Sequence, residues 1–221
     1  MNQMTETDLQ ECLAEAARLA RAGDYDAAIA LLQPMLRDAA GCWPLRAALV
    51  DLYEVTGAQA QAVEALRAHI EGEPASVEAR LRLVELFARA GQPRQALDEV
   101  RMAVALRPDS PQALHMLGRL SGRDDAAAMD AFTRAMALAP DWNLPRCHLA
   151  ERLRARGESA QALELLREAT GRAPGDRAAW MLLAETLLEQ DDAAGWDAYE
   201  WRFDCGGRTP QYPGTSAPVW D

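Results

Sequence analysis

The residues best suited to chemistry in this chain are its cysteines and histidines. They stand far apart and include no CxxC pair, at Cys12, Cys42, Cys147 and Cys205 and at His69, His115 and His148. Thiolates and imidazoles hold zinc when they occur in closely spaced pairs. Cys147 and His148 are neighbours, but consecutive residues of a helix point about 100° apart and cannot readily share an ion. The spacing therefore indicates free thiols, and we predict no metal site and no cofactor.

The carboxylates do not indicate catalysis either. Aspartates and glutamates are plentiful, but on the outside of helices such side chains are usually solvated. The sequence has no Ser/His/Asp set, no helix with metal-ligand spacing and no phosphate-binding glycine loop. The nearest approach to such a loop, Cys205-Gly206-Gly207, has no strand pattern before it and no helix pattern after it. We predict no catalytic residue and no turnover by this chain alone.

The elements that must position these side chains repeat about every 34 residues. Three kinds of residue keep this period: the alanines Ala28, Ala62, Ala96, Ala128 and Ala162, the glycines Gly23, Gly57, Gly91 and Gly157, and the prolines Pro74, Pro108, Pro140 and Pro174. Glycine ends a first helix, alanine lets a second helix cross it closely, and proline closes the pair. The period therefore predicts an all-α chain of stacked helix pairs.

The helix pairs divide the chain into one long array and a tail. The array covers residues 1–203, with pairs at about 9–42, 43–76, 77–110, 111–142, 143–176 and 177–203. The tail, residues 204–221, is rich in proline and glycine. Such a composition is typical of a linker, and we expect it to lead toward a further domain.

Composition and charge exclude several classes of partner. The formal net charge is −11 and the pI is about 4.8. A nucleic-acid-binding surface needs clustered basic residues, so nucleic acid is not an expected partner. No apolar run approaches the roughly 20 residues that cross a bilayer, and the polar, acidic start lacks a signal pattern. We expect a cytoplasmic protein that does not bind membranes.

The repeats carry a recognisable pattern. Gly23-Asp24-Tyr25 opens one second helix, and two others contain an alanine, an aromatic or leucine residue, a second alanine and a proline at fixed spacing. These are Ala128, Phe132, Ala135 and Pro140, and Ala162, Leu166, Ala169 and Pro174. The chain resembles tetratricopeptide repeat proteins over residues ~9 to ~203. The resemblance implies a right-handed α-solenoid that binds other proteins.

The sixth pair departs from the pattern. Trp196 stands where the register calls for the small crossing residue, within Gly195-Trp-Asp-Ala-Tyr-Glu-Trp-Arg-Phe203. The segment resembles the junction in bacterial tetratricopeptide repeat glycosyltransferases, including enzymes that modify flagellin, just before their catalytic domain. The resemblance implies a capping or junction helix and a domain-junction role for Trp196, Tyr199, Trp201, Arg202 and Trp220. Alternatively, Trp196, Tyr199, Trp201 and Phe203 only cap the open end of the array.

The same resemblance assigns a partner-binding groove to the first helix of each pair. Its expected positions are Leu81, Arg82, Glu85, His115, Met116, Arg119, Cys147, His148, Glu151, Arg154, Met181 and Glu185. In the first two pairs the equivalent positions are Leu13, Ala17, Ala47, Asp51 and Glu54. Apolar residues between charges of both signs fit an amphipathic segment of a client protein. Arg82, Arg119 and Arg154 would contact acidic client groups, or else pair within the chain.

Two functions are consistent with these features. In the first, the chain recruits the acceptor of a bacterial protein glycosyltransferase, with flagellin as one candidate client. In the second, it is a free-standing scaffold or chaperone-like adaptor with no associated enzyme. Exposed aromatic residues near the C-terminal end would also allow self-association.

Overall fold

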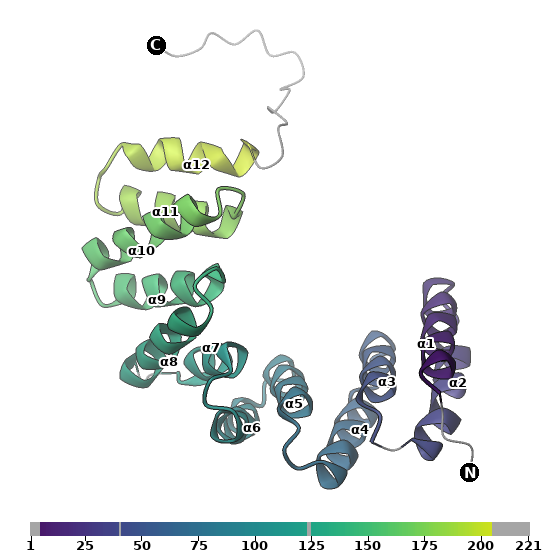
Figure 1. Ribbon diagram of the computed structural model, residues 1–221. Helices are drawn as coiled ribbons and strands as arrows, with labels where there is room; N and C mark the ends of the chain where they lie inside the picture. Colours follow the sequence, from purple (N-terminus) through teal and green to yellow (C-terminus); the bar gives the residue numbers. More distant parts are fainter. Residues whose placement is uncertain (1–4, 40, 123–124, 205–221) are drawn as a thin grey trace, which may run out of the picture. The chain divides into compact units, whose positions relative to one another are not determined.

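The computed structural model describes residues 5–39, 41–122 and 125–204, which form twelve α-helices and no strand. The chain divides into two compact units, Met1–Pro108 and Asp109–Asp221. In the N-terminal unit the helices are α1 (Glu6–Arg21), α2 (Tyr25–Asp38), α3 (Trp43–Val55), α4 (Gln59–Gly72), α5 (Val77–Arg89) and α6 (Pro93–Leu106). Each odd-numbered helix packs against the even-numbered helix that follows it (Figure 1).

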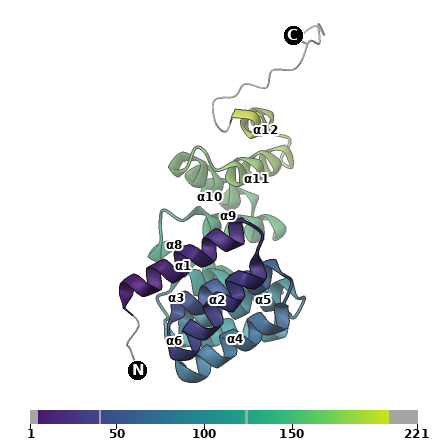
Figure 2. The same cartoon turned by 90° about the vertical axis from the view of Figure 1, so that its right-hand side faces the viewer.

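The C-terminal unit continues the pattern of pairs. Its helices are α7 (Pro111–Leu120), α8 (Asp125–Leu138), α9 (Asn143–Ala155), α10 (Ser159–Arg172), α11 (Arg177–Leu188) and α12 (Ala194–Asp204). In Figure 2, α9 to α12 follow one another as successive layers of this unit. The predicted all-α array of helix pairs is confirmed, and the second helix of the sixth pair is the aromatic-rich one.

The turns inside the pairs form where the sequence predicts. Gly23, Gly57, Gly91 and Gly157 have φ values between 68° and 81°, in the left-handed region that ends a helix. The sixth pair reverses in the same way without a glycine: Asp191, 34 residues after Gly157, has φ 56°. A residue with a Cβ atom is strained in this conformation. The α11–α12 turn therefore carries backbone strain that the other turns avoid.

Asp191→Gly is expected to stabilise the α11–α12 pair by roughly 0.5 kcal/mol, because it removes the left-handed strain but adds freedom to the unfolded chain. The matched change is Gly157→Ala, which introduces the same strain at a site with open space around the added Cβ. It should destabilise α9–α10 by about 1 kcal/mol. Amide hydrogen exchange of the two helix pairs measures both effects, and a loss of protection in Asp191→Gly would contradict the argument.

The column of alanines lies where the two helices of a pair cross. Its five members are fully buried, at Ala28, Ala62, Ala96, Ala128 and Ala162. A methyl group at the crossing lets larger side chains interdigitate beside it, as Leu32 and Leu166 do in the first and fifth pairs. The core of each unit is therefore a row of such crossings.

A second set of equivalent residues, which the repeat pattern does not reveal, forms hydrogen bonds between one helix pair and the end of the pair before it. At equivalent positions, Arg80, Arg146 and Trp180 each donate to the carbonyl of the proline six residues earlier. These bonds run from Arg80 Nη2 to Pro74 O at 3.1 Å, from Arg146 Nη1 to Pro140 O at 3.4 Å and from Trp180 Nε1 to Pro174 O at 2.9 Å. The closing prolines thus supply hydrogen-bond acceptors as well as ending helices.

The sixth pair packs differently from the others at Trp196, where the repeat register calls for a small residue. Its side chain is 62% exposed, while its neighbour Gly195 and the following Ala198 are buried against α11. A Cβ added at Gly195 would lie 2.7 Å from Leu188 Cγ and 3.0 Å from Ala184 O, so Gly195 makes the close approach. The packing register of α12 is shifted by one residue, because an indole does not fit the crossing.

Candidate functional site

A small apolar cavity lies on the side of the N-terminal unit formed by first helices. It has a volume of about 230 Å³ between α1 and α3. The lining residues are Leu13, Ala16, Ala17, Ala20, Tyr25, Ala48, Asp51, Leu52 and Val55. Alanines along α1 leave this space because their side chains are too short to fill it. Val55, at the edge of the cavity, is an apolar side chain with 63% exposure.

An ion-pair network borders this cavity on α3 and α5. Arg82 pairs with Asp51 and lies 3.5 Å from Glu54 and 4.0 Å from Glu85, measured between nitrogen and oxygen. Arg89 also reaches Glu54, at 2.8 Å. Arg82 is therefore held by carboxylates of its own chain. This is the second of the two roles considered for it above, the first being a contact with an acidic client group. Leu81, beside Arg82, is half-buried.

The C-terminal unit brings two of the predicted groove residues into direct contact. His115 Nε2 lies 2.9 Å from His148 Nδ1, so one ring donates a hydrogen bond to the other. The His115 ring also packs on Trp142, with centroids 4.7 Å apart, and on Phe132, at 5.9 Å. Burial, reinforced by His148 and Arg119, lowers the pKa of His115 to about 4. His115 is on α7 and His148 is on α9, and their direct contact could not be predicted from the sequence.

The pKa of His148 is also lowered, chiefly by burial, although Glu151 offsets part of the effect. Cys147 is buried, and this burial raises the pKa of its thiol to about 12. The thiol of Cys147 is thus protonated at neutral pH and unsuited to nucleophilic chemistry. Neither His115 nor Cys147 presents its side chain on the surface.

The remaining predicted positions of this unit lie nearer the surface. Arg154 pairs with Glu185 at 2.9 Å and with Glu189 at 3.7 Å, so it links α9 to α11. Arg119 and Glu151 are exposed, and the thioether side chains of the other two positions, Met116 and Met181, are half-buried. The groove assignment as a whole stays a prediction.

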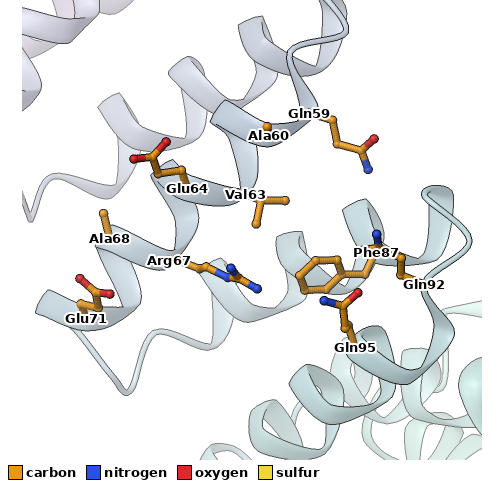
Figure 3. Close-up of a pocket in the computed structure, with 10 residues that line it drawn as sticks. All are labelled: Gln59, Ala60, Val63, Glu64, Arg67, Ala68, Glu71, Phe87, Gln92 and Gln95. Atoms are coloured by element: carbon orange, nitrogen blue, oxygen red, sulfur yellow. The ribbon is translucent and has the colours of Figure 1, made fainter.

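A larger and more polar cavity, of about 680 Å³, lies elsewhere in the N-terminal unit (Figure 3). Most of its lining comes from second helices, α4 and α6. The α4 residues Val63 and Arg67 extend toward Phe87 of α5, with the Arg67 guanidinium 6.0 Å from the ring centroid. The rest of the lining comes from Gln59, Ala60, Glu64, Ala68, Glu71, Gln92 and Gln95. Most of its lining side chains are polar or charged, in contrast to the cavity between α1 and α3.

The predicted junction residues gather at α12. Trp201 stacks on Trp180 of α11, with centroids 4.8 Å apart and rings 3° from parallel. Trp196 meets Tyr199 edge-on at 6.3 Å. The Arg202 side chain and Trp220 lie outside the described residues. The stack covers the end of α11, as a cap would, whereas Trp196 does not.

Metal-binding clusters and membrane-spanning helices are both absent from the described ranges. Across residues 5–39, 41–122 and 125–204, no group of three or more His, Cys, Asp or Glu side chains is arranged to hold a metal ion. In the same part of the chain, every helix is too short or too polar to span a bilayer. Cys12, Cys42 and Cys147 are free thiols, and Cys205 lies outside the described residues.

Comparisons with known proteins agree with the helix-pair architecture. The tetratricopeptide repeat family model matches residues 77–120 and 148–186. The sequence matches no curated protein. The fold resembles that of pilF from Pseudomonas aeruginosa, with a TM-score of 0.71, 15% identity and coverage of 93% of this chain and 92% of that one.

Two further solved structures show the same fold. MamA superposes with a TM-score of 0.64 at 21% identity, covering 79% of this chain and 97% of MamA. YrrB, described as a TPR protein with an unusual peptide-binding site, superposes with a TM-score of 0.60 at 14% identity over 79% of this chain and 92% of YrrB. These likenesses show the fold of the chain, and the tetratricopeptide repeat family model matches two parts of it.

Proposed function

We propose that this chain, which matches the tetratricopeptide repeat family model over residues 77–120 and 148–186, is a protein-binding module that holds an amphipathic segment of a client protein. The observation that carries the proposal is the apolar cavity between α1 and α3, beside the exposed Val55. Its volume of about 230 Å³ is below the roughly 300–1,000 Å³ of typical small-molecule sites, so one large apolar side chain suits it better. The solved structure of YrrB, a protein of this fold with a peptide-binding site, adds support.

The ion pairs beside the cavity suit the polar side of the same segment. Asp51, Arg82 and Glu54 form a preassembled set of both charges next to an apolar surface. Such a border disfavours purely apolar ligands and orients an amphipathic helix, while contributing little affinity of its own. The apolar side chain in the cavity should supply most of the binding, at about 1.5–3 kcal/mol for a fully buried leucine or phenylalanine.

Filling the cavity is expected to weaken client binding at least tenfold. Ala17 is exposed and lines the cavity, so Ala17→Leu occupies the space without disturbing the core. The probe is an amphipathic 16-residue peptide selected from a displayed library on the wild-type protein. Its affinity for the wild type and the variant is measured by fluorescence anisotropy.

The matched control is Ala60→Leu, the same substitution at an exposed alanine of the larger, polar cavity. This control should bind the peptide as the wild type does. Circular dichroism verifies that both variants keep their helices. If Ala17→Leu binds the selected peptide with unchanged affinity, the cavity is not the client site and the proposal is wrong.

We also propose, as the more specific form of this function, that the module gathers the acceptor of a bacterial protein glycosyltransferase, with flagellin as the candidate client. The observation that favours it is the exposed Trp196 on α12, since a residue used only as a cap would be covered. A client tethered to the array meets a neighbouring catalytic domain more often than a free one. The free-standing scaffold or adaptor is the other form of the same binding function.

The two forms make different predictions for the gene and the product. The glycosyltransferase form requires that the reading frame continue after Asp221 into an α/β domain. It also requires that the whole protein, given a nucleotide sugar, increase the mass of purified flagellin. A frame that ends at Asp221, or flagellin of unchanged mass, would favour the adaptor.

A further inference from the structure

A second surface of the C-terminal unit, on α12, has features of a recognition site. The Trp196 indole is 62% exposed, although tryptophan is largely buried in most proteins. Its edge-on contact with Tyr199, at a centroid distance of 6.3 Å, holds the ring against its own helix. The exposed indole does not result from loose packing, because Gly195 and Ala198 fill the contact with α11. We call Trp196, Asp197 and Glu200 the α12 outer face.

The sequence around this face is mainly acidic, although Arg202 follows in the same helix. From Glu185 to Trp201 the sequence has six acidic residues and no arginine or lysine. Glu185 and Glu189 are compensated by Arg154, and the Asp192 carboxylate accepts a hydrogen bond from the Ala194 amide. Asp191 lies in the α11–α12 turn, so Asp197 and Glu200 are the two carboxylates of this stretch that lie on α12 with the indole.

The helix geometry places these groups together. Glu200 follows Trp196 by four residues and Asp197 by three, so Glu200 lies beside both on the surface of α12, whereas Asp197 is about 100° around the helix from Trp196. All three are exposed. An indole ring attracts a cation to its face, and neighbouring carboxylates strengthen this attraction. The face thus combines the two kinds of group that recognise an arginine or lysine side chain.

We propose that the α12 outer face binds an arginine- or lysine-bearing segment of a partner protein. This goes beyond the proposed client site, which lies in the N-terminal unit and takes an apolar side chain. Charge complementarity selects this partner: a second copy of the chain, with net charge −11, would bring like charges together. A small quaternary ammonium ligand is a poorer fit, because it needs an enclosing set of rings.

The probe is a blocked peptide of four Arg-Gly-Ser repeats, and its control has citrulline at each arginine position, which keeps the shape and removes the charge. Binding is followed by calorimetry and by the indole N–H signal of Trp196 in NMR spectra. The arginine peptide should bind and shift that signal, while the citrulline peptide should do neither. Trp196→Ala should weaken binding about threefold to fivefold, as expected for an exposed cation–π contact.

A matched pair of charge variants separates recognition from simple attraction to an acidic protein. Asp197→Asn/Glu200→Gln removes two charges from the α12 outer face, and Glu64→Gln/Glu71→Gln removes two charges from exposed positions of α4. The first variant should weaken binding several-fold at roughly physiological salt, and the second should leave it nearly unchanged. Equal weakening by both pairs would overturn the proposal, and so would unaltered binding by Trp196→Ala.

Self-association is tested in the same samples by sedimentation velocity. A wild-type dimer that Trp196→Ala dissociates would assign the face to a second copy and would overturn the proposal. A monomer at the concentrations used for the peptide titration supports it. Because the client cavity is left intact in all these variants, failure here leaves the proposed client binding unaffected.

Discussion

Gly118→Ala is expected to destabilise the C-terminal unit by about 2 kcal/mol, although alanine is the better helix former. A Cβ atom at this position would lie 2.6 Å from Cε1 and 2.8 Å from Cδ1 of Phe132, a ring with 1% exposure. The ring also packs on His115 and His148, so it cannot move away without disturbing these contacts. Overpacking of a filled core typically costs about 1–3 kcal/mol, more than the roughly 1 kcal/mol that alanine gains in helix propensity.

The control is Gly171→Ala, in α10 of the same unit, where an added Cβ meets nothing within 4 Å. It should be neutral or slightly stabilising. Phe132→Leu supplies the second test, because leucine occupies this position in the first and fifth pairs as Leu32 and Leu166. Alone it should cost about 1–2 kcal/mol. The double variant Gly118→Ala/Phe132→Leu should lose about 1 kcal/mol less stability than the sum of the two single variants. This difference would show that the two residues are in contact.

Amide hydrogen exchange across α7–α10 measures these free energies locally, which matters because repeat arrays need not unfold in one step. Additive effects of Gly118→Ala and Phe132→Leu would mean that the ring does not limit the size of residue 118. A destabilised Gly171→Ala would show that the effect belongs to helix glycines in general rather than to this contact.

Acidification from about pH 7 to about pH 5 is expected to cost the C-terminal unit about 2 kcal/mol through His115 alone. Burial lowers the pKa of His115 to about 4 in the folded chain, against the usual 6.5. The neutral ring of His115 is the form that fits the folded chain, so above pH 6.5 the fold has its full stability. As the pH falls from 6.5 toward 4, the unfolded chain binds a proton at His115 more readily than the folded chain, and this stability is lost. Protonation of His115 would also place a second positive charge near Arg119.

The groups around the histidine pair agree with a loss of stability on acidification. His148 accepts or donates the 2.9 Å bond and has a lowered pKa itself, while Glu151 is the neighbouring carboxylate that opposes the shift. Phe132 and Trp142 supply apolar contacts and no compensating charge. The loss of stability should therefore be concentrated in the exchange of α7 and α9.

His115→Gln provides the control, because a carboxamide can replace the hydrogen bond to His148 without titrating. The variant should be less stable at neutral pH and should lose less protection than the wild type over the same acidification. NMR titration of the His115 ring checks the pKa directly. A variant with the same pH dependence as the wild type would remove His115 as the cause.

Part of the candidate site was predictable from the sequence, and part was not. The periodic spacing placed His115 and His148 on equivalent helices, yet only the packed unit shows their contact and their burial. Arg82 and Arg154 were expected at the same surface, and the structure pairs both with carboxylates of their own chain. The apolar cavity between α1 and α3 was not predicted, although Leu13, Ala17 and Asp51, which line it, were among the expected groove positions.

By itself the sequence determined the fold class and the helix pairs, because glycine, alanine and proline act through the local backbone and recur about every 34 residues. The tertiary structure decided the rest: the shift of α12 that exposes Trp196, the cavity beside α1 and the pairing of the histidines. Each depends on the fit between side chains from helices distant in sequence. Such fit is a property of shape and volume in three dimensions, which spacing along a chain does not encode.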